Sequence, residues 1–267
     1  MSDPAALMAD AATLLESVVI SDRVAGWQAI GDICNGHPET VAVVWPLARA
    51  TIARESSVEV LAMALWALQM MTTPEVCDQA LALILAHAAS TSPALRLAVA
   101  QAIPSCAGDP ADPQATRALI RLTADECGDI RNWATFGLGR LSNLDTPEIR
   151  EVLAAHLDDA HDETRNEALI GLARRADERA IASAIRELTA DSVGVLAVHA
   201  AALLGDARLH PTLLELRDWW DVDPDLLEEA IRRCDPHGQP TDLGHFESYE
   251  DYMFFTFGPG KDYVAGN

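Results

Sequence analysis

Lysine is almost missing from this 267-residue chain, in which Lys261 is the only one. The 19 lysine and arginine residues stand against 41 acidic residues, so the formal net charge is −22. A surface this acidic repels phosphate backbones and anionic lipid headgroups, and we therefore expect neither nucleic acid nor membrane as a partner. The charge favours a basic partner, although acidity alone also serves to keep a protein in solution.

Paired cysteines and long apolar runs are also lacking. The five cysteines are far apart, without Cys-x-x-Cys spacing, and their odd number leaves one unpaired in any disulfide scheme. Reduced cysteines are typical of a cytoplasmic protein. The most apolar runs, residues 60–68 and 80–89, are too short to span a bilayer, and the acidic N-terminus does not resemble a signal peptide. The sequence therefore predicts a cytoplasmic protein.

Aromatic residues make up only 5% of the chain, and clusters of β-branched residues bounded by turn signals are scarce. Alanine and leucine dominate instead, which indicates helices throughout. With 267 residues the chain exceeds the usual size of a single core, so it forms either two globular domains or one elongated array. This composition favours the array.

What the sequence contains is a helical repeat of about 34 residues. The runs "GDIRNWATFGLG" (128–139) and "DETRNEALIGLA" (162–173) share arginine, asparagine, alanine and leucine in one frame. With Arg131 and Arg165 as reference positions, the equivalent residues elsewhere are Gly26, Glu59, Arg96, Gly194 and Leu227. Residues one before, three after and seven after a reference position share one stripe of a helix, which predicts a packed face. Its centre holds small residues, which are Ala29, Ala62, Val99, Ala134, Ala168, Ala197 and Ala230.

Partner helices are expected between these second helices, and several begin with helix-entry signals such as proline after threonine or aspartate. They span residues 39–54, 74–89, 113–123, 147–156, 179–188 and 209–218. Each repeat is then a helical hairpin that can bury its apolar face only against neighbouring hairpins.

The runs "GDIRNWATFGLGRL", "DETRNEALIGLARR" and "DSVGVLAVHAAALLGD" resemble the second helices of HEAT repeats, in particular the short bacterial type also found in phycobilin lyases. The resemblance is strong over residues 93–206, weaker over 20–90 and lost beyond 235. It implies an all-α fold, namely a right-handed α-solenoid of about seven hairpins whose second helices line a concave surface. We expect the solenoid to occupy residues 1–234.

The resemblance also implies a structural role for Arg131 and Arg165, which match the arginine of the HEAT motif. That arginine usually bridges to an acidic residue of its own or a neighbouring turn, so the expected partners are Asp129, Asp162 and Glu163. Alternatively, these arginines point into the groove and hold a carboxylate ligand.

Motifs of the catalytic proteins with this fold are missing. There is no His-Glu-x-x-His and no repeated His-Glu dipeptide of the kind that HEAT-like deoxyhypusine hydroxylases use for iron, and nucleophile and phosphate-loop motifs are absent as well. A chelate of His156 and His161 with Asp158 or Asp159 would lack a third placed ligand. A HEAT-like alkylpurine DNA glycosylase would need a basic groove, whereas this chain is acidic. We therefore expect no catalytic residue, no metal and no cofactor.

Binding remains as a function, and the second helices offer candidates beside the packed stripe. An aromatic pair next to amides and a carboxylate suits an interface core, because aromatic side chains concentrate binding energy while polar neighbours set orientation. The candidate partner-binding residues are Asn132, Trp133, Phe136, Asn166, Glu167, Ile170 and His199. Trp133 and Phe136 could equally pack beneath an adjacent repeat, and the sequence leaves both interpretations open.

The C-terminal segment, residues 235–267, differs in composition from the repeats. It contains all three tyrosines and four of the five phenylalanines. This aromatic, acidic segment can fold back as a cap on the last repeat near Trp219 and Trp220, or it can dock into a partner in trans. The exposure of so many aromatic side chains to water would favour aggregation, so we expect the cap.

We therefore expect a non-catalytic scaffold whose acidic concave groove binds a basic protein partner. Two further interpretations remain open. One is an immunity or antitoxin protein that neutralises a cationic toxin, because negative charge speeds the capture of such a partner. The other is a lyase-like accessory factor for a cofactor-bearing enzyme, as the phycobilin lyase resemblance would imply. The sequence indicates no particular oligomeric state.

Overall fold

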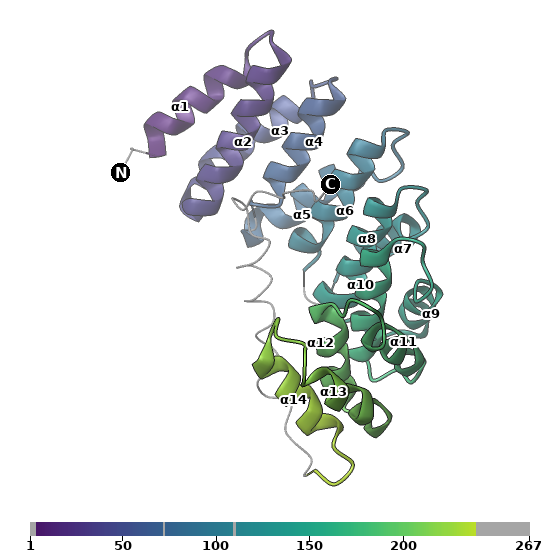
Figure 1. Cartoon of the computed structure of the whole chain (residues 1–267). Coiled ribbons are helices and arrows are strands. Elements are labelled where there is room, and N and C mark those ends of the chain that lie inside the picture. Colours follow the sequence, from purple (N-terminus) through teal and green to yellow (C-terminus); the bar gives the residue numbers. More distant parts are fainter. Residues whose placement is uncertain (1–3, 72, 109–110, 239–267) are drawn as a thin grey trace. The chain divides into compact units, whose positions relative to one another are not determined.

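The computed structural model describes residues 4–71, 73–108 and 111–238, and within these residues the regular structure is helical, with no strand (Figure 1). The predicted all-α fold is thereby confirmed. The α-helices are α1 (Pro4–Leu15), α2 (Ile20–Gly36), α3 (Val41–Ile52), α4 (Val58–Leu68), α5 (Pro74–Leu85), α6 (Pro93–Cys106), α7 (Pro113–Leu122), α8 (Gly128–Phe136), α9 (Pro147–Ala155), α10 (Asp162–Ala173), α11 (Arg179–Leu188), α12 (Val195–Leu204), α13 (His210–Leu216) and α14 (Pro224–Cys234). The shorter elements are the 3-10 helices η1 (Pro38–Thr40) and η3 (Ala207–Leu209) and the π-helix η2 (Gly137–Leu141).

Two compact units make up the chain, Met1–Ser183 and Ala184–Asn267, and the boundary between them lies within α11. In the first unit the second helices lie side by side in the order α2, α4, α6, α8, α10, and each packs on the first helix of its own hairpin (Figure 1). In the second unit α14 packs on both α12 and α13. Helices that contact only their neighbours in the series are the defining feature of a repeat array.

The starts of the first helices follow the predicted signals. Pro74, Pro113 and Pro147 are the first residues of α5, α7 and α9. Proline fits this position because the first amide of a helix has no acceptor within the helix. Before α7, the Asp112 carboxylate accepts hydrogen bonds from the backbone N–H groups of Gln114 and Ala115, at 2.6 and 3.1 Å. These local preferences explain why the hairpin boundaries could be predicted closely.

Small residues form the buried seam between successive second helices, as the repeat pattern predicts. Ala134, Ala168, Ala197 and Ala230 are buried, and so is Val99. Small side chains at such positions let adjacent helices approach each other closely.

The predicted register is wrong in the first two hairpins. Ala29 and Ala62 are only partly buried, whereas Gly26 and Ala64 are fully buried. The reference position in α2 is therefore Arg23 instead of Gly26, and in α4 it is two residues after the predicted Glu59. Alanine recurs so often in these helices that the apolar pattern alone does not fix the phase.

A polar side chain in the loop before each second helix of the first unit sets the register. Its oxygen accepts a hydrogen bond from the backbone N–H two residues later, which ends the loop and starts the helix. The residues with this role are Ser17, Glu55, Ser90, Asp125 and Asp159. In four of these hairpins the arginine six residues later donates a hydrogen bond to the carbonyl oxygen of the same loop residue. These arginines are Arg23, Arg96, Arg131 and Arg165.

Three of the arginines also bridge to the carboxylate in the loop of the next hairpin. Arg131 donates through Nε and Nη2 to the two oxygens of Asp159, at 2.8 and 2.7 Å. The equivalent pairs are Arg23–Glu55 and Arg96–Asp125. Each arginine therefore ties one hairpin to the next, in an arrangement that we call the arginine ladder. Two-point hydrogen bonding of this kind is strong and geometrically specific.

The expected partner of Arg131 was therefore wrong. Asp129 lies 3.5 Å from the Nε2 atom of His161, while Arg131 binds Asp159. A carboxylate that ends a loop is better placed for two-point contact than one exposed on the first turn of the same helix. Arg165 lies 2.8 Å from Asp162, which is one of the partners expected from the sequence.

We expect Asp159→Asn to lower the free energy of unfolding by about 1–2 kcal/mol near neutral pH, because it removes a charge-assisted pair at nearly constant volume. The Arg131 guanidinium holds the pKa of the Asp159 carboxyl well below its ordinary value. The stabilisation is therefore present above the unfolded-state pKa of about 4 and is lost as the pH falls towards the folded-state pKa. Urea unfolding near pH 7 and near pH 3 measures this difference. A deficit of equal size at both pH values would contradict the assignment.

The last described helix has a polar outer face. Its exposed side chains include Asp225 and Glu228, and Glu228 pairs with Arg217 at 2.8 Å. Trp220 is buried and donates a hydrogen bond to the carbonyl oxygen of Val193, while Trp219 is exposed. A polar outer face is typical of a terminal repeat. The expected aromatic cap lies outside the described residues, which end at residue 238, and the predicted boundary after residue 234 stays a prediction.

Candidate functional site

An aromatic pair on α8 reaches the surface of the first unit. Trp133 and Phe136 are both partly exposed, with ring centroids 5.6 Å apart and ring planes at 86°. This edge-to-face arrangement is favourable for two aromatic rings. Asn132 precedes the pair and is also partly exposed, but its Oδ1 atom is buried and accepts no hydrogen bond from the described residues. The α8 surface therefore presents two aromatic rings, whereas the unsatisfied Oδ1 acceptor of Asn132 is not exposed to solvent.

Beneath Phe136 lies a buried ion pair. The Nη1 atom of Arg140, in η2, is 3.0 and 3.2 Å from the two carboxylate oxygens of Glu167 in α10. The guanidinium carbon of Arg140 also lies 5.2 Å from the centre of the Phe136 ring, within the range of a cation–π contact. Burial raises the pKa of Glu167, and the charge of Arg140 opposes that rise. Glu167 is thus bound within the chain, which corrects its assignment as a partner-binding residue.

Two more of the predicted binding residues are buried. Ile170 lies in the part of α10 that is buried throughout, from Glu167 to Ala173. In the second unit, all residues from Ala197 to Ala202 are buried, so α12 is covered on every side and His199 is buried with it. Offsets from a reference position identify a helix face, but they do not show how much of that face the neighbours cover.

The π-helix η2 continues α8 and turns Arg140 inward. Its freed carbonyl oxygens are bound by the buried guanidinium of Arg175, which donates to Leu138 at 2.9 Å and to Gly139 at 3.0 Å. The same guanidinium also donates to the carbonyl oxygens of Gly171, Ser142 and Leu144. A π-helix interrupts the regular backbone hydrogen bonds, and one arginine here satisfies the groups that are left over.

An acidic edge, formed by Asp129, Asp162 and Glu163, lies at the first turns of α8 and α10. Their side chains are 69%, 76% and 59% exposed, so their charges act on the solvent side. The Nε2 atom of His161 lies 3.5 Å from Asp129 and 3.4 Å from Glu163, so the acidic ends of the two helices converge on one ring. Gly128 makes this possible, because a Cβ atom there would lie 2.5 Å from the ring.

The corrected register reveals two surface residues that the sequence pattern did not identify. Met63 and Trp66 on α4 follow Leu61 at the offsets at which Trp133 and Phe136 follow Arg131, and both are partly exposed. Trp66 packs over Gly31 of α2, where an added Cβ atom would lie 2.6 Å from the ring. A search for loop residues such as Glu55 would have placed this helix correctly.

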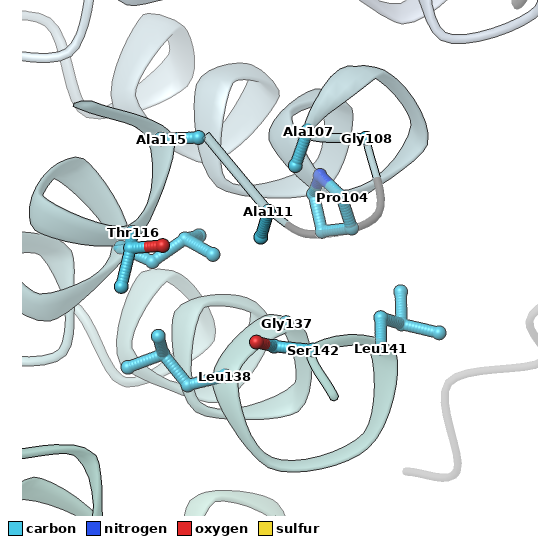
Figure 2. A pocket seen from close by; sticks show the side chains of 11 residues that line it. Pro104, Ala107, Gly108, Ala111, Ala115, Thr116, Gly137, Leu138, Leu141 and Ser142 are labelled. Carbon is cyan, nitrogen blue, oxygen red and sulfur yellow. The ribbon is translucent and has the colours of Figure 1, made fainter. Parts of the chain in front are cut away.

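The pocket between α6, α7 and η2 is small. Figure 2 shows Pro104, Thr116 and Leu138 among the side chains that line it. Its interior has room for about one water molecule, so it is too small for a cofactor. Within the described residues no group of three or more histidine, cysteine or acidic side chains is arranged to hold a metal ion, and none of their helices has the length and apolar character needed to cross a bilayer.

Burial makes three of the cysteine thiols, those of Cys34, Cys106 and Cys234, poor nucleophiles. It raises the pKa of Cys106 and Cys234 to about 12 each, and it also raises the pKa of Cys34. These thiols remain protonated at neutral pH, whereas the thiolate is the reactive form.

No protein-family model matches the chain. Protein YibA of Escherichia coli, strains K12 and O157:H7, is 36% identical over 113 residues, which cover 42% of this chain. The match spans 40% of the length of these curated relatives.

Solved structures with similar folds include the crystal structure of YibA, which covers 88% of this chain and 98% of its own with a TM-score of 0.53 at 21% identity. An engineered protein matches 85% of this chain and 67% of its own with a TM-score of 0.54 at 17% identity. At such identities the likeness concerns the fold alone. Together with the stacked hairpins, it shows that the chain has the fold of a HEAT-type helical-repeat α-solenoid.

Proposed function

We propose that this protein is a non-catalytic scaffold that binds a basic protein partner on the first unit. The supporting observation is the position of the acidic edge, because Asp129 lies on α8, which also carries Asn132 and Trp133, and Glu163 lies on α10, which packs on α8. Solenoids present extended surfaces of stacked helices to their partners. Exposed carboxylates attract and orient a cationic surface, while half-exposed aromatic side chains supply contact area.

The distribution of charge supports a basic partner more strongly than net charge does. The three carboxylates of the acidic edge are exposed, although Asp162 pairs with Arg165, whereas the carboxylates of the arginine ladder are nearly buried and paired. Exposed charges of one sign, placed together, produce a local potential that speeds the encounter with an oppositely charged surface. This electrostatic attraction weakens as salt is added.

The expected result is salt-dependent capture of a partner. In pull-downs from extracts of the cells that make the protein, the immobilised full chain should retain a basic protein at about 50 mM salt and lose most of it at about 500 mM salt. The bound proteins are identified and their isoelectric points compared. Capture of an acidic partner, or retention that is equal at both salt concentrations, would be evidence against the proposal.

A charge-matched pair of variants locates the surface. Neutralisation of the acidic edge in Asp129→Asn/Asp162→Asn/Glu163→Gln should weaken binding of the captured partner about tenfold at low salt. The control removes three exposed carboxylates from first helices, in Glu75→Gln/Asp78→Asn/Glu148→Gln, and should leave binding nearly unchanged. Equal losses in both variants would show that only the overall charge matters and would reject the acidic edge as the site.

A further inference from the structure

The fold brings two cysteines of the third hairpin together. Cys77 lies in the first turn of α5, and Cys106 is the last residue of α6. Because the two helices pack on each other, the start of α5 lies beside the end of α6, and the two thiols share a hydrogen bond. No Cys-x-x-Cys spacing marks this pair, so the sequence pattern did not reveal it.

The two thiols differ in exposure and in acidity. Cys77 is partly exposed, whereas Cys106 is buried. Burial raises the pKa of both thiols, that of Cys106 to about 12, but the hydrogen bond from Cys106 opposes the rise at Cys77. The S–H group of Cys106 is therefore the donor, and the contact stabilises the thiolate of Cys77. Since the thiolate is the reactive form, Cys77 is the sulfur that can attack an oxidant from the solvent.

We propose that Cys77 and Cys106 form a reversible disulfide that covalently joins the start of α5 to the end of α6 under oxidising conditions. The oxidant is a small disulfide such as oxidised glutathione. This inference goes beyond the proposed function and does not depend on it, because the pair lies in the third hairpin and its formation requires no protein partner.

Two thiol–disulfide exchanges complete the reaction. The Cys77 thiolate attacks one sulfur of the small disulfide, which forms a mixed disulfide at Cys77 and releases one small thiolate. The sulfur of Cys106 then attacks the Sγ atom of Cys77, and the second small thiolate leaves and takes up the proton of Cys106. The two protein thiols thereby lose two electrons, and the small disulfide is reduced to two thiols.

Burial of Cys106 does not prevent the second exchange. Its target sulfur is already in contact with it, and a reaction between two groups held together proceeds as if their concentration were very high. The first exchange is slower than that of a free thiol, because the carboxylates of Asp78 and Glu75 also raise the pKa of Cys77. The disulfide therefore forms under sustained oxidising conditions.

Oxidation of the folded full chain tests the pairing. The chain is incubated without denaturant at increasing ratios of oxidised to reduced glutathione, the remaining thiols are blocked, and its peptides are mapped by mass spectrometry without reduction. We expect a peptide pair linked through Cys77 and Cys106 as the main product, and its loss when dithiothreitol is added. In urea the same treatment should give no preferred pair. A different main pair in the folded chain, or no linked pair when nearly all glutathione is oxidised, would overturn the inference.

Single variants test the role of each sulfur. Cys106→Ser should accumulate a mixed disulfide with glutathione at Cys77, whereas Cys77→Ser should leave the buried Cys106 unmodified. The matched control is Cys127→Ser, which removes a partly exposed thiol just before α8 and should form the linked pair as the parent does. Thermal unfolding of the reduced variants shows whether the fold is retained. Equal uptake of glutathione by Cys106 in Cys77→Ser and by Cys77 in Cys106→Ser would overturn the assigned order of attack.

Hydrogen exchange measures the effect of the disulfide on the hairpin. The amides of α5 should exchange at least about tenfold more slowly in the oxidised chain than in the reduced chain, because the bond opposes separation of the two helices. Cys106→Ser treated with the same buffer should show no such slowing, which controls for bound glutathione. Equal exchange in the oxidised and reduced parent chains would show that the disulfide does not hold the hairpin closed.

Discussion

Replacement of Arg140 by methionine is expected to lower the free energy of unfolding by about 3–5 kcal/mol near neutral pH. The variant leaves the Glu167 carboxylate, whose residue is only 7% exposed, without the guanidinium at 3.0 Å. A buried carboxylate that has lost its counter-charge bears most of its desolvation cost uncompensated. This effect is large against a total stability of about 5–15 kcal/mol, and urea unfolding measures it directly.

The double variant Arg140→Met/Glu167→Leu is the matched control. It replaces both charges by apolar side chains, and it should recover most of the lost stability, because a buried ion pair often contributes little compared with well-packed apolar residues. The second comparison measures the stability of the single variant and of the parent at different pH values. Burial raises the pKa of Glu167, and loss of Arg140 removes the charge that opposes that rise.

In the single variant the folded state therefore binds more protons than the unfolded state at mildly acidic pH. Its deficit relative to the parent should be greatest near pH 7 and should shrink as the pH falls towards about 5. A double variant as unstable as the single one, or a deficit that grows on acidification, would show that the pair is not the source of the effect.

The second large effect is expected at Gly171, where α10 meets η2. A Cβ atom there would lie 2.8 Å from the Cα atom of Gly139 and 2.9 Å from a methyl group of Leu153. The backbone of Gly139 cannot move away from the added Cβ atom as a flexible side chain could, so α10 and η2 must move apart. We expect Gly171→Ala to cost about 2 kcal/mol and Gly171→Val about 3 kcal/mol, despite the better helix propensity of alanine.

Gly36 provides the control for this prediction. It is the last residue of α2, and a Cβ atom there would meet nothing within 4 Å. Gly36→Ala should therefore leave the free energy of unfolding unchanged or raise it by about 0.4–1 kcal/mol, because alanine lowers the conformational entropy of the unfolded chain. Thermal unfolding of Gly171→Ala, Gly171→Val and Gly36→Ala gives the comparison. Similar midpoints for all three would show that the close approach of α10 and η2 is not tightly packed.

The helices and their boundaries could be predicted because local chemistry decides them. Proline at the start of α5, α7 and α9, together with a polar residue before it, fixes the helix entry whatever the helix packs against. The phase of α2 and α4 was less predictable, because alanine suits both the packed stripe and its flanks. The loop residues Ser17 and Glu55 contain the missing information, since their hydrogen bonds to the next turn fix where each helix begins.

The candidate site was predictable only where it depends on helix faces. Asn132, Trp133 and Phe136 are partly exposed, and their role in partner binding stays a prediction. Glu167 shares its offset with Trp133, but the π-helix brings Arg140 over it and buries it, and no periodic pattern reveals a π-helix. The ion pair between Arg131 and Asp159 could not be predicted from the sequence for a related reason. It joins residues 28 apart, whereas the HEAT motif suggested partners close to the start of the same helix.

The arginine ladder has a gap. At the second hairpin its position is occupied by Leu61, which has no hydrogen-bond donor in its side chain, although the hairpins on either side contribute Arg23 and Arg96. The junction after α4 consequently depends on packing and on the contacts that Gln79 of α5 makes with Trp45 and Arg49 of α3. The junction without an arginine bridge is therefore the weakest in the first unit. Local unfolding should begin there, so that the two N-terminal hairpins unfold together while the hairpins joined by arginine bridges stay folded.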